Sequence, residues 1–461
     1  MKRYLYIILF LITSFCTKGQ NWLGFGNLIP PTGYVESLYV NPAGNKLYIG
    51  GIFQSTLNGK TFRNIMVYDG LTFDTLGTGV TTGLRVTDIV EYKNNMYICG
   101  LIGYFGTKLI KGVAKWNGTK WDSLGVQING GGGILTFKIF NNELYMGGQF
   151  SGIGSLNENT IVKYDGTNWL PVGTTPFPYI YVSTTVNINS MEVYNNELYV
   201  GGTFYDSLGN HICIAKFDGT NWKTVGVTMY GGFSYITTLK VYNNKLYVAG
   251  RFKEIEGNVG NAIMRFDGTT WTNVGKAITD AGACIIRNMQ VINNKLWVVG
   301  GFKSVEDTLD AGGIAYWNDT VWCVPPTGPE IYNSTSLAHF QNKIFMGGSF
   351  NLIGGDTLNN LVILNTNATT CTRNPYHTTQ NNIPFNVFPN PFTNDITIQI
   401  PTDYTLNDTK ISITNTLGQL LLTIHPTNYN KIINTASLAS GMYYLTLSDN
   451  ANKKSTKIIK E

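Results

Sequence analysis

The sequence predicts an all-β protein: a seven-bladed β-propeller closed by an N-terminal strand, followed by a small Ig-like β-sandwich. The first observation is a unit of roughly fifty residues that recurs along the chain, a period typical of solenoids and propellers. The second is that each unit contains four strand patterns and almost no helical periodicity. The third is a run of alternating strands and turn signals after residue 385, which is typical of a β-sandwich.

A strand of the type Leu-Tyr-Val-Gly-Gly marks each unit. It occurs seven times, at 47–51, 96–100, 144–148, 198–202, 246–250, 296–300 and 344–348. Aromatic residues of these and the neighbouring strands recur from unit to unit, so we expect them to pack between units. The repeat therefore predicts the fold rather than the chemistry.

The unit around residues 190–226 shows the order of its strands, which fall at 190–194, 198–204, 212–217 and 222–226. Asn195-Asn196 suits a two-residue hairpin, because Asn tolerates positive φ. Asp218-Gly219 predicts a second two-residue hairpin of type I′, and Asp-Gly or Asn-Gly recurs at this place in other units. The last unit lacks its fourth strand, and 21–26 resembles one. We therefore expect the N-terminal strand to complete the seventh blade.

Composition limits the function classes. Charged residues make up 13% of the 461 residues, aromatic residues 13%, and the net charge is +5. No basic patch suggests a nucleic-acid partner. No apolar run reaches the length of a membrane span, so no transmembrane segment is expected.

Residues 1–19 are interpreted as a secretory signal peptide. Lys2 and Arg3 form its charged start, and an apolar run extends to Phe15. Cys16 leaves a lipoprotein signal as an alternative, although Phe15 stands where that signal has a small residue. The other cysteines are odd in number, so at least one thiol stays free. Cys99 stands where other units have Gly, Ala or Val, which indicates a small buried residue. A Cys323–Cys371 pair is left open, because blades spread apart at their outer edges.

The strand order places both tight turns of every unit on one face and the variable connections on the other, around the channel mouth. Loops on a rigid scaffold often carry binding residues. The aromatic candidates for ligand binding are Tyr104, Phe105, Phe177, Tyr179, Tyr181, Tyr230, Phe233 and Tyr235. They could stack on sugars or contact a protein; alternatively, they pack inward and order their own loops.

Catalytic and metal-binding patterns are weak. The four histidines have no metal-ligand spacing, and no Cys-x-x-Cys occurs. We expect no metal and no cofactor, and we assign no catalytic residue. The alternative is an enzyme that uses loop carboxylates for acid–base chemistry, and its candidates are Glu254, Glu256, Glu306, Asp307, Asp310 and Asp356.

After a polar linker at 372–384, the chain continues with Phe388-Pro389-Asn390-Pro391, then Leu417-Gly418-Gln419, Gly441-Met442-Tyr443-Tyr444, and a basic end containing Lys457 and Lys460. Residues 385–461 thereby resemble the type A C-terminal sorting domain of the type IX secretion system of Bacteroidota. The resemblance implies export across the outer membrane and cleavage by a surface sortase. The repeats resemble kelch-like propellers in architecture, although an aromatic residue two places after the Gly-Gly departs from the kelch signature.

These observations predict four parts: a signal peptide (1–19), a propeller (20–371), a linker (372–384) and a sorting domain (385–461). We expect a monomer that reaches the periplasm and is then secreted or displayed on the cell surface. Its partners would be the type IX machinery, its sortase, and a glycan or protein ligand. The predicted function is binding or adhesion, with a carbohydrate-active lyase or hydrolase as the alternative.

Overall fold

The computed structural model describes residues 22–125, 128–129, 132–154, 156, 160–173, 186–205, 210–227, 229–231, 234–276, 278, 284–306, 309–325, 332–350, 352–353, 356–364, 371, 385–401, 404–415, 419–449 and 453–461. Within this part the chain is all-β, and its helices are the short 3-10 turns η1 (Gly26–Leu28), η2 (Glu254–Glu256) and η4 (Leu406–Asp408). None of its helices is long and apolar enough to cross a membrane. The chain divides into two compact units, Met1–Arg373 and Asn374–Glu461.

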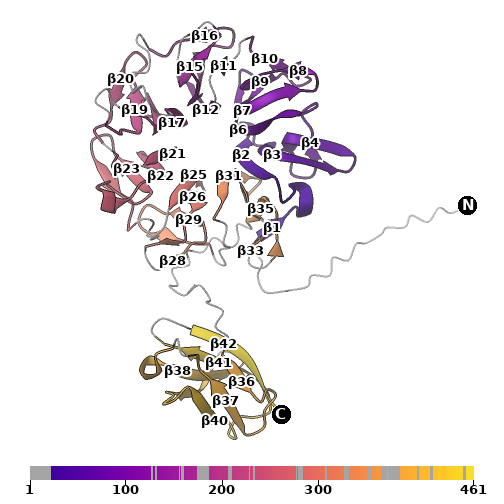
Figure 1. Cartoon of the computed structure of the whole chain (residues 1–461), viewed down its shortest axis with the longest axis vertical. Helices are drawn as coiled ribbons and strands as arrows, with labels where there is room; N and C mark the ends of the chain where they lie inside the picture. Colours follow the sequence, from indigo (N-terminus) through magenta and orange to yellow (C-terminus); the bar gives the residue numbers. More distant parts are fainter. Residues whose placement is uncertain are drawn as a thin grey trace, which may run out of the picture. The chain divides into compact units, whose positions relative to one another are not determined.

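The first unit is a propeller-like ring of antiparallel sheets, each with four main strands (Figure 1). We number the sheets 1 to 7 in chain order and give their strands from the centre outward. Sheet 1 contains β2 (Tyr34–Val40), β3 (Leu47–Leu57), β4 (Lys60–Tyr68) and β5 (Phe73–Asp74). Sheet 2 contains β6 (Thr82–Tyr92), β7 (Asn95–Phe105), β9 (Val113–Trp116) and β10 (Trp121–Ser123), with β8 (Lys108–Leu109) beside β7. Sheet 3 contains β12 (Gly133–Phe140), β13 (Glu143–Gln149), β15 (Ile161–Tyr164) and β16 (Trp169–Leu170).

The remaining sheets of the ring repeat this order. Sheet 4 contains β17 (Asn187–Tyr194), β18 (Glu197–Thr203), β19 (Ile214–Phe217) and β20 (Trp222–Thr224). Sheet 5 contains β21 (Tyr235–Tyr242), β22 (Lys245–Arg251), β23 (Ile263–Phe266) and β24 (Trp271–Asn273). Sheet 6 contains β25 (Ile285–Ile292), β26 (Lys295–Gly301), β29 (Ile314–Trp317) and β30 (Trp322–Cys323). Sheet 7 contains β31 (Ser334–Phe340), β32 (Lys343–Gly348), β35 (Leu361–Leu364) and β1 (Trp22–Gly24).

Short two-stranded ladders lie between these strands. They pair β11 (Ile128–Asn129) with β14 (Gly152–Ile153), β27 (Ser304–Val305) with β28 (Leu309–Asp310), and β33 (Leu352–Ile353) with β34 (Asp356–Thr357).

The N-terminal strand closes the ring as the sequence predicts. In β1, Trp22 pairs with Leu364 and Gly24 with Val362, so the first described strand forms the outer edge of the last sheet. Side chains also connect sheets 7 and 1: Thr335 Oγ1 donates to the Val35 carbonyl oxygen over 2.5 Å, and Asn360 Nδ2 donates to that of Pro30 over 2.8 Å.

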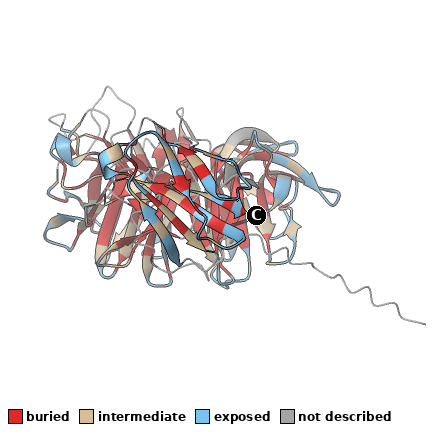
Figure 2. Ribbon diagram, turned by 90° about the horizontal axis from the view of Figure 1, so that it is seen from below, coloured by how far each residue is buried: buried red, intermediate tan, exposed pale blue. Residues whose placement is uncertain are grey.

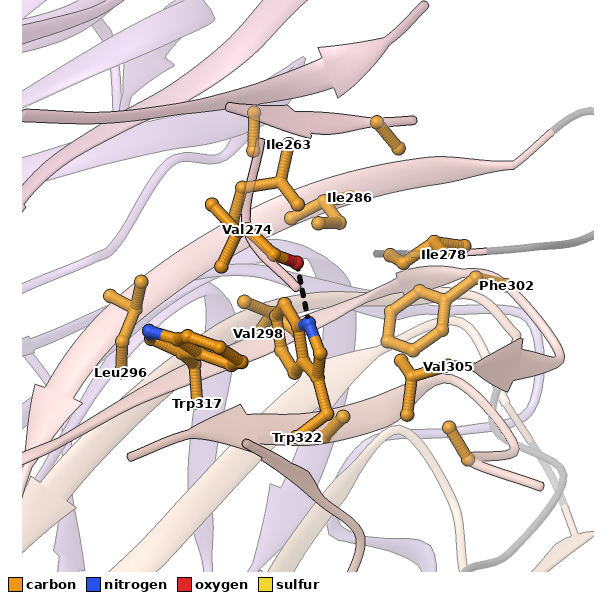
Figure 3. Packing of buried hydrophobic residues seen from close by; sticks show 14 of the residues in the cluster. Ile263, Val274, Ile278, Ile286, Leu296, Val298, Phe302, Val305, Trp317 and Trp322 are labelled. Atoms are coloured by element: carbon orange, nitrogen blue, oxygen red, sulfur yellow. Dashed lines mark hydrogen bonds between the residues drawn. The ribbon is translucent and has the colours of Figure 1, made fainter. Parts of the chain in front are cut away.

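The hydrophobic core lies between sheets. Seven clusters of buried residues each combine side chains of two neighbouring sheets, including sheets 7 and 1. Figure 2 shows the buried residues concentrated along the strands. Between sheets 5 and 6, Trp322 packs beside Phe302 and donates its indole N–H to the Val274 carbonyl oxygen over 2.9 Å (Figure 3). The expectation that the repeated aromatic residues pack between units is confirmed here.

The two hairpin turns differ. Both Asn195 and Asn196 have positive φ, as the two-residue prediction requires. At the Asp-Gly turn that prediction is wrong: Phe217 pairs with Trp222, so the loop has four residues. The Asp218 Oδ1 atom accepts the amides of Thr220 and Asn221, over 2.9 and 2.8 Å. Asp or Asn therefore recurs here because its side chain satisfies two loop amides.

Close backbone packing explains why the last position of the Leu-Tyr-Val-Gly-Gly motif is Gly. Each of the seven innermost strands has a register shift at the same place, for example between Ile188 and Ser190. There the backbone approaches the next strand so closely that a Cβ at Gly202 would lie 2.0 Å from the Asn187 carbonyl oxygen. The bulge directs one extra residue of each strand toward the centre of the ring.

The second unit consists of two antiparallel sheets around one core. The three-stranded sheet contains β36 (Asn386–Phe388), β37 (Asp395–Gln399) and β40 (Asn430–Asn434). The four-stranded sheet contains β39 (Leu420–Ile424), β38 (Lys410–Asn415), β41 (Gly441–Ser448) and β42 (Lys453–Lys460).

The structure contains the Cys323–Cys371 disulfide that the sequence left open. Cys323 in β30 forms a disulfide with Cys371, with a Cα–Cα distance of 5.0 Å. Because β1 supplies the outer strand of sheet 7, the chain after β35 does not fill that place and can return to sheet 6. Cys99 is free and fully buried, as predicted.

Candidate functional site: the central channel

The seven innermost strands surround a channel of about 570 Å³ at the centre of the ring. Its wall is formed mostly by hydroxyl, amide and charged side chains. Sequence reasoning placed the site at the variable loops and missed this channel. A signal was present in the sequence, because six of the seven innermost strands have a polar residue at the bulge position, and only β12 has an apolar one, Leu135.

The bulge residues line the channel: Glu36, Thr87, Leu135, Asn189, Thr237, Arg287 and Thr335. Four of them connect neighbouring sheets. Thr87 Oγ1 donates to the Ile134 carbonyl oxygen over 3.2 Å, and Asn189 Nδ2 donates to that of Ile236 over 2.8 Å. Thr237 and Thr335 make the equivalent bonds to Ile286 and Val35.

Two clusters of charged side chains line the channel. In one, Lys138 forms an ion pair with Glu192, and burial lowers the pKa of the neighbouring Lys240. In the other, Arg85 Nη1 lies 3.3 Å from Glu36 Oε1. Burial raises the pKa of Glu36, against the opposing effect of Arg85 and Arg287.

Asp88 occupies the position after the bulge, where other sheets have Ser, Thr or Asn. Its two carboxylate oxygens accept the amides of Ile89 and Phe137 over 2.8 and 2.7 Å, so the group joins β6 to β12. Although the residue as a whole is only half-buried, burial of its carboxyl group raises its pKa to about 6. Both oxygens therefore have a structural role.

The described aromatic candidates do not form one patch. Tyr104 is 40% exposed in β7 and Tyr230 is 50% exposed beside η2, whereas Phe105 is buried against Trp121. Tyr235 is half-buried and lines the channel, the single candidate among the described ones to do so. Phe177, Tyr179, Tyr181 and Phe233 lie outside the described residues.

The loop carboxylates are scattered. Glu254 and Glu256 are exposed on η2, and Glu306 and Asp310 are half-buried near β27 and β28. Asp307 and the side chain of Asp356 lie outside the described part. Across the residues that the structure describes, no three His, Cys, Asp or Glu side chains gather as a metal site would require.

Comparison with known proteins assigns the second unit. Residues 386–461 match the family of secretion system C-terminal sorting domains. This region is a type IX sorting domain. The protein is therefore exported by type IX secretion to the cell surface or the exterior. No curated protein matches the chain.

Several solved structures are similar to the chain. PorZ, a surface component of the type IX secretion system of Porphyromonas gingivalis, is 14% identical, with a TM-score of 0.39, over 93% of this chain and 65% of PorZ. The extracellular domain of the putative hybrid two-component system BT3049 from B. thetaiotaomicron is 12% identical, with a TM-score of 0.44, over 95% of this chain and 57% of that one. This chain thus spans less than two thirds of either structure.

The sequence pattern singled out several residues of the sorting domain. Three of them, Asn390, Tyr443 and Lys460, make hydrogen bonds within the domain. Asn390 holds β42: its Nδ2 donates to the Lys457 carbonyl oxygen over 3.0 Å, and its Oδ1 accepts the Ile459 amide. Tyr443 is buried and donates to the Ala439 carbonyl oxygen. Lys460 is buried and donates to that of Thr435.

Other residues of the same motif are exposed in the sorting domain: Phe388, Pro389, Pro391, Gly441 and Lys457. Gly418 lies outside the described residues.

Proposed function

We propose that the protein is a surface-displayed or released binding module, a kelch-like seven-bladed β-propeller with an Ig-like sorting domain. The observation that carries the proposal is the polar channel of about 570 Å³, a volume within the range of small-ligand sites. Its wall offers hydrogen-bonding groups and the half-buried ring of Tyr235. Hydroxyl-rich glycans match both, and a protein ligand is the second possibility.

A glycan and polysaccharide array tests this proposal. We expect the purified chain to bind a subset of glycans, and Leu135→Tyr, which narrows the channel, to weaken binding. Leu71→Tyr is the matched control, because Leu71 is 90% exposed and lies outside the channel lining. Equal binding by the Leu135 variant would exclude the channel, and failure on every glycan would favour a protein ligand.

The alternative of a carbohydrate-active enzyme requires two acids that face each other across a substrate. The strongest acid candidate, Asp88, has both oxygens bonded to backbone amides. We therefore propose non-covalent binding without turnover. Release of reducing ends or unsaturated sugars from any polysaccharide that the chain binds would overturn this choice.

The export route is proposed in more detail from the two ends of the chain. We propose that residues 1–19 are removed after passage to the periplasm, that residues 20–371 form the propeller, and that a sortase cleaves within or after the linker 372–384. Mass spectrometry of the exported monomer tests both cleavages. A mature protein that retains Met1, or that retains Glu461 outside the cell, would contradict the corresponding step.

A further inference from the structure

One side of the channel has polar atoms that no protein group satisfies. Glu36 Oε2, Ser37 Oγ, Arg85 Nε, Asn288 Oδ1 and Ser336 Oγ are buried and have no hydrogen-bond partner within the described residues. All five residues line the channel. They belong to sheets 6, 7, 1 and 2, which are consecutive because the ring closes between sheets 7 and 1. We call this side the open wall.

The opposite side, formed by sheets 3, 4 and 5, is largely satisfied. Lys138 pairs with Glu192, and Ser190 Oγ accepts the Leu239 amide over 3.0 Å. Asn189 and Thr237 donate to the next sheet. Buried polar atoms without a partner are rare in proteins, and several on one side of a cavity indicate a bound polar species. The difference between the two sides therefore marks where a ligand would lie.

The open wall offers two guanidinium groups to the channel, those of Arg85 and Arg287. Arg85 and Arg287 flank Glu36, and the Arg85–Glu36 distance of 3.3 Å is longer than that of a strong charged pair. Asp88, the other carboxylate of these four sheets that lines the channel, accepts two backbone amides. Arg287 is exposed to the channel, and none of the ion pairs found in the described part includes it. A guanidinium group has a planar fork that suits a carboxylate.

The mixed character of the unsatisfied atoms narrows the ligand chemistry. Asn288 Oδ1 and Glu36 Oε2 need donors, Arg85 Nε needs an acceptor, and the two serine hydroxyls take either role. Sugar hydroxyls also donate and accept, so a sugar ring can satisfy all of them. Glu36 would repel a phosphate dianion more than a singly charged carboxylate.

We propose that the open wall binds a uronic-acid residue of an acidic glycan. Its carboxylate pairs with Arg287 and Arg85, and its hydroxyls satisfy Glu36, Asn288 and the two serines. Tyr235 lies on the satisfied side of the same channel and offers an aromatic ring to the sugar face. This inference rests on the proposed function and specifies the ligand class of the same channel.

Calorimetry with two matched probes tests the inference: a galacturonic acid trisaccharide and the galactose trisaccharide of equal length. We expect the purified chain to bind the acidic probe more tightly. Arg287→Gln should weaken that binding about tenfold or more, because it removes a charge-assisted contact. Lys276→Gln removes one exposed positive charge outside the channel lining and should leave binding unchanged.

A second variant should change the affinity for the acidic probe in the opposite direction. Glu36→Gln removes the negative charge beside the two arginines and should strengthen binding of the acidic probe. Circular dichroism checks that each variant folds. If Glu36→Gln and Arg287→Gln both weaken binding equally, the carboxylate is not recognised by the open wall.

The outcomes separate this inference from the proposed function. Equal binding of both trisaccharides, or tighter binding of the neutral one, overturns the uronic-acid inference and leaves glycan binding intact. Binding of neither trisaccharide overturns the inference, and the array then decides about glycans in general. If a poly-glutamate peptide binds in their place and Arg287→Gln abolishes that binding, the partner is an acidic protein and the glycan assignment fails.

Discussion

Asp88→Ser should change how the stability of the ring depends on pH. Burial raises the pKa of Asp88 from 3.8 to about 6 in the folded protein. Between these values the folded state holds a proton that the unfolded state has lost. The free energy of unfolding therefore falls as pH rises through this window and is lower above it. The difference between the two pKa values lowers the free energy of unfolding by at most about 3 kcal/mol above this window.

The serine variant removes the carboxyl group and keeps the bond between sheets. Ser190 shows this at the equivalent position of sheet 4, where its Oγ accepts the Leu239 amide. Relative to the parent, Asp88→Ser should gain stability as pH rises from about 4 to about 6. The titratable neighbours whose charge interacts with Asp88 are Lys138, Cys99 and Tyr39.

Urea unfolding followed by tryptophan fluorescence measures the effect. All nine tryptophans precede residue 323, so the signal reports on the ring and not on the sorting domain. Asp122→Ser is the control of opposite sign, because a hydrogen bond from Lys108 lowers the pKa of Asp122. Parallel pH profiles for the parent and Asp88→Ser would refute the reasoning.

Three further predictions concern the ring. Gly202→Ala should lower the free energy of unfolding by about 1–3 kcal/mol, because the new Cβ would collide with backbone atoms. Gly201→Ala should cost less, because the nearest atoms to its Cβ belong to the Ile236 and Leu239 side chains. Equal losses of stability in thermal unfolding would contradict this. Replacing Cys323 and Cys371 by Ser should lower the free energy of unfolding by about 4 kcal/mol, because the disulfide closes a loop across a sequence separation of 48. A reductant should then have no further effect on stability. Trp322→Phe should lower the free energy of unfolding by about 1–3 kcal/mol more than Trp297→Phe. The first variant leaves the Val274 carbonyl oxygen unpaired, whereas the Trp297 indole N–H has no partner in the described part of the chain. Denaturation midpoints that shift equally would exclude a role for the hydrogen bond.

Much of the ring was predictable because its signals are local and repeated. The Asn195-Asn196 hairpin depends on the φ preference of Asn, and the pairing of the Trp22 strand follows from a missing strand in the last unit. The Asp218 loop was predicted incorrectly, because Asp-Gly alone does not show whether the carboxylate accepts loop amides. The Cys323–Cys371 bond depends on where the chain goes after sheet 7, which no local pattern shows.

The candidate site was mostly beyond sequence reasoning. The sequence singled out loop aromatics because they vary, and of those described only Tyr235 lines the channel. Glu36, Arg85 and Arg287 lie in three different units, and nothing in their spacing shows that they meet. They meet because ring closure brings sheets 6, 7, 1 and 2 together around one channel.

The sequence by itself determined the repeat, the strand order and the sorting domain, because each is a pattern within a few tens of residues. The tertiary structure alone decided the reason for the Leu-Tyr-Val-Gly-Gly repeat and the place of the candidate site. Its second Gly is required where a bulged strand passes too close for a Cβ. The same bulge directs one side chain per sheet into the channel, and two of these side chains, Glu36 and Arg287, belong to the open wall.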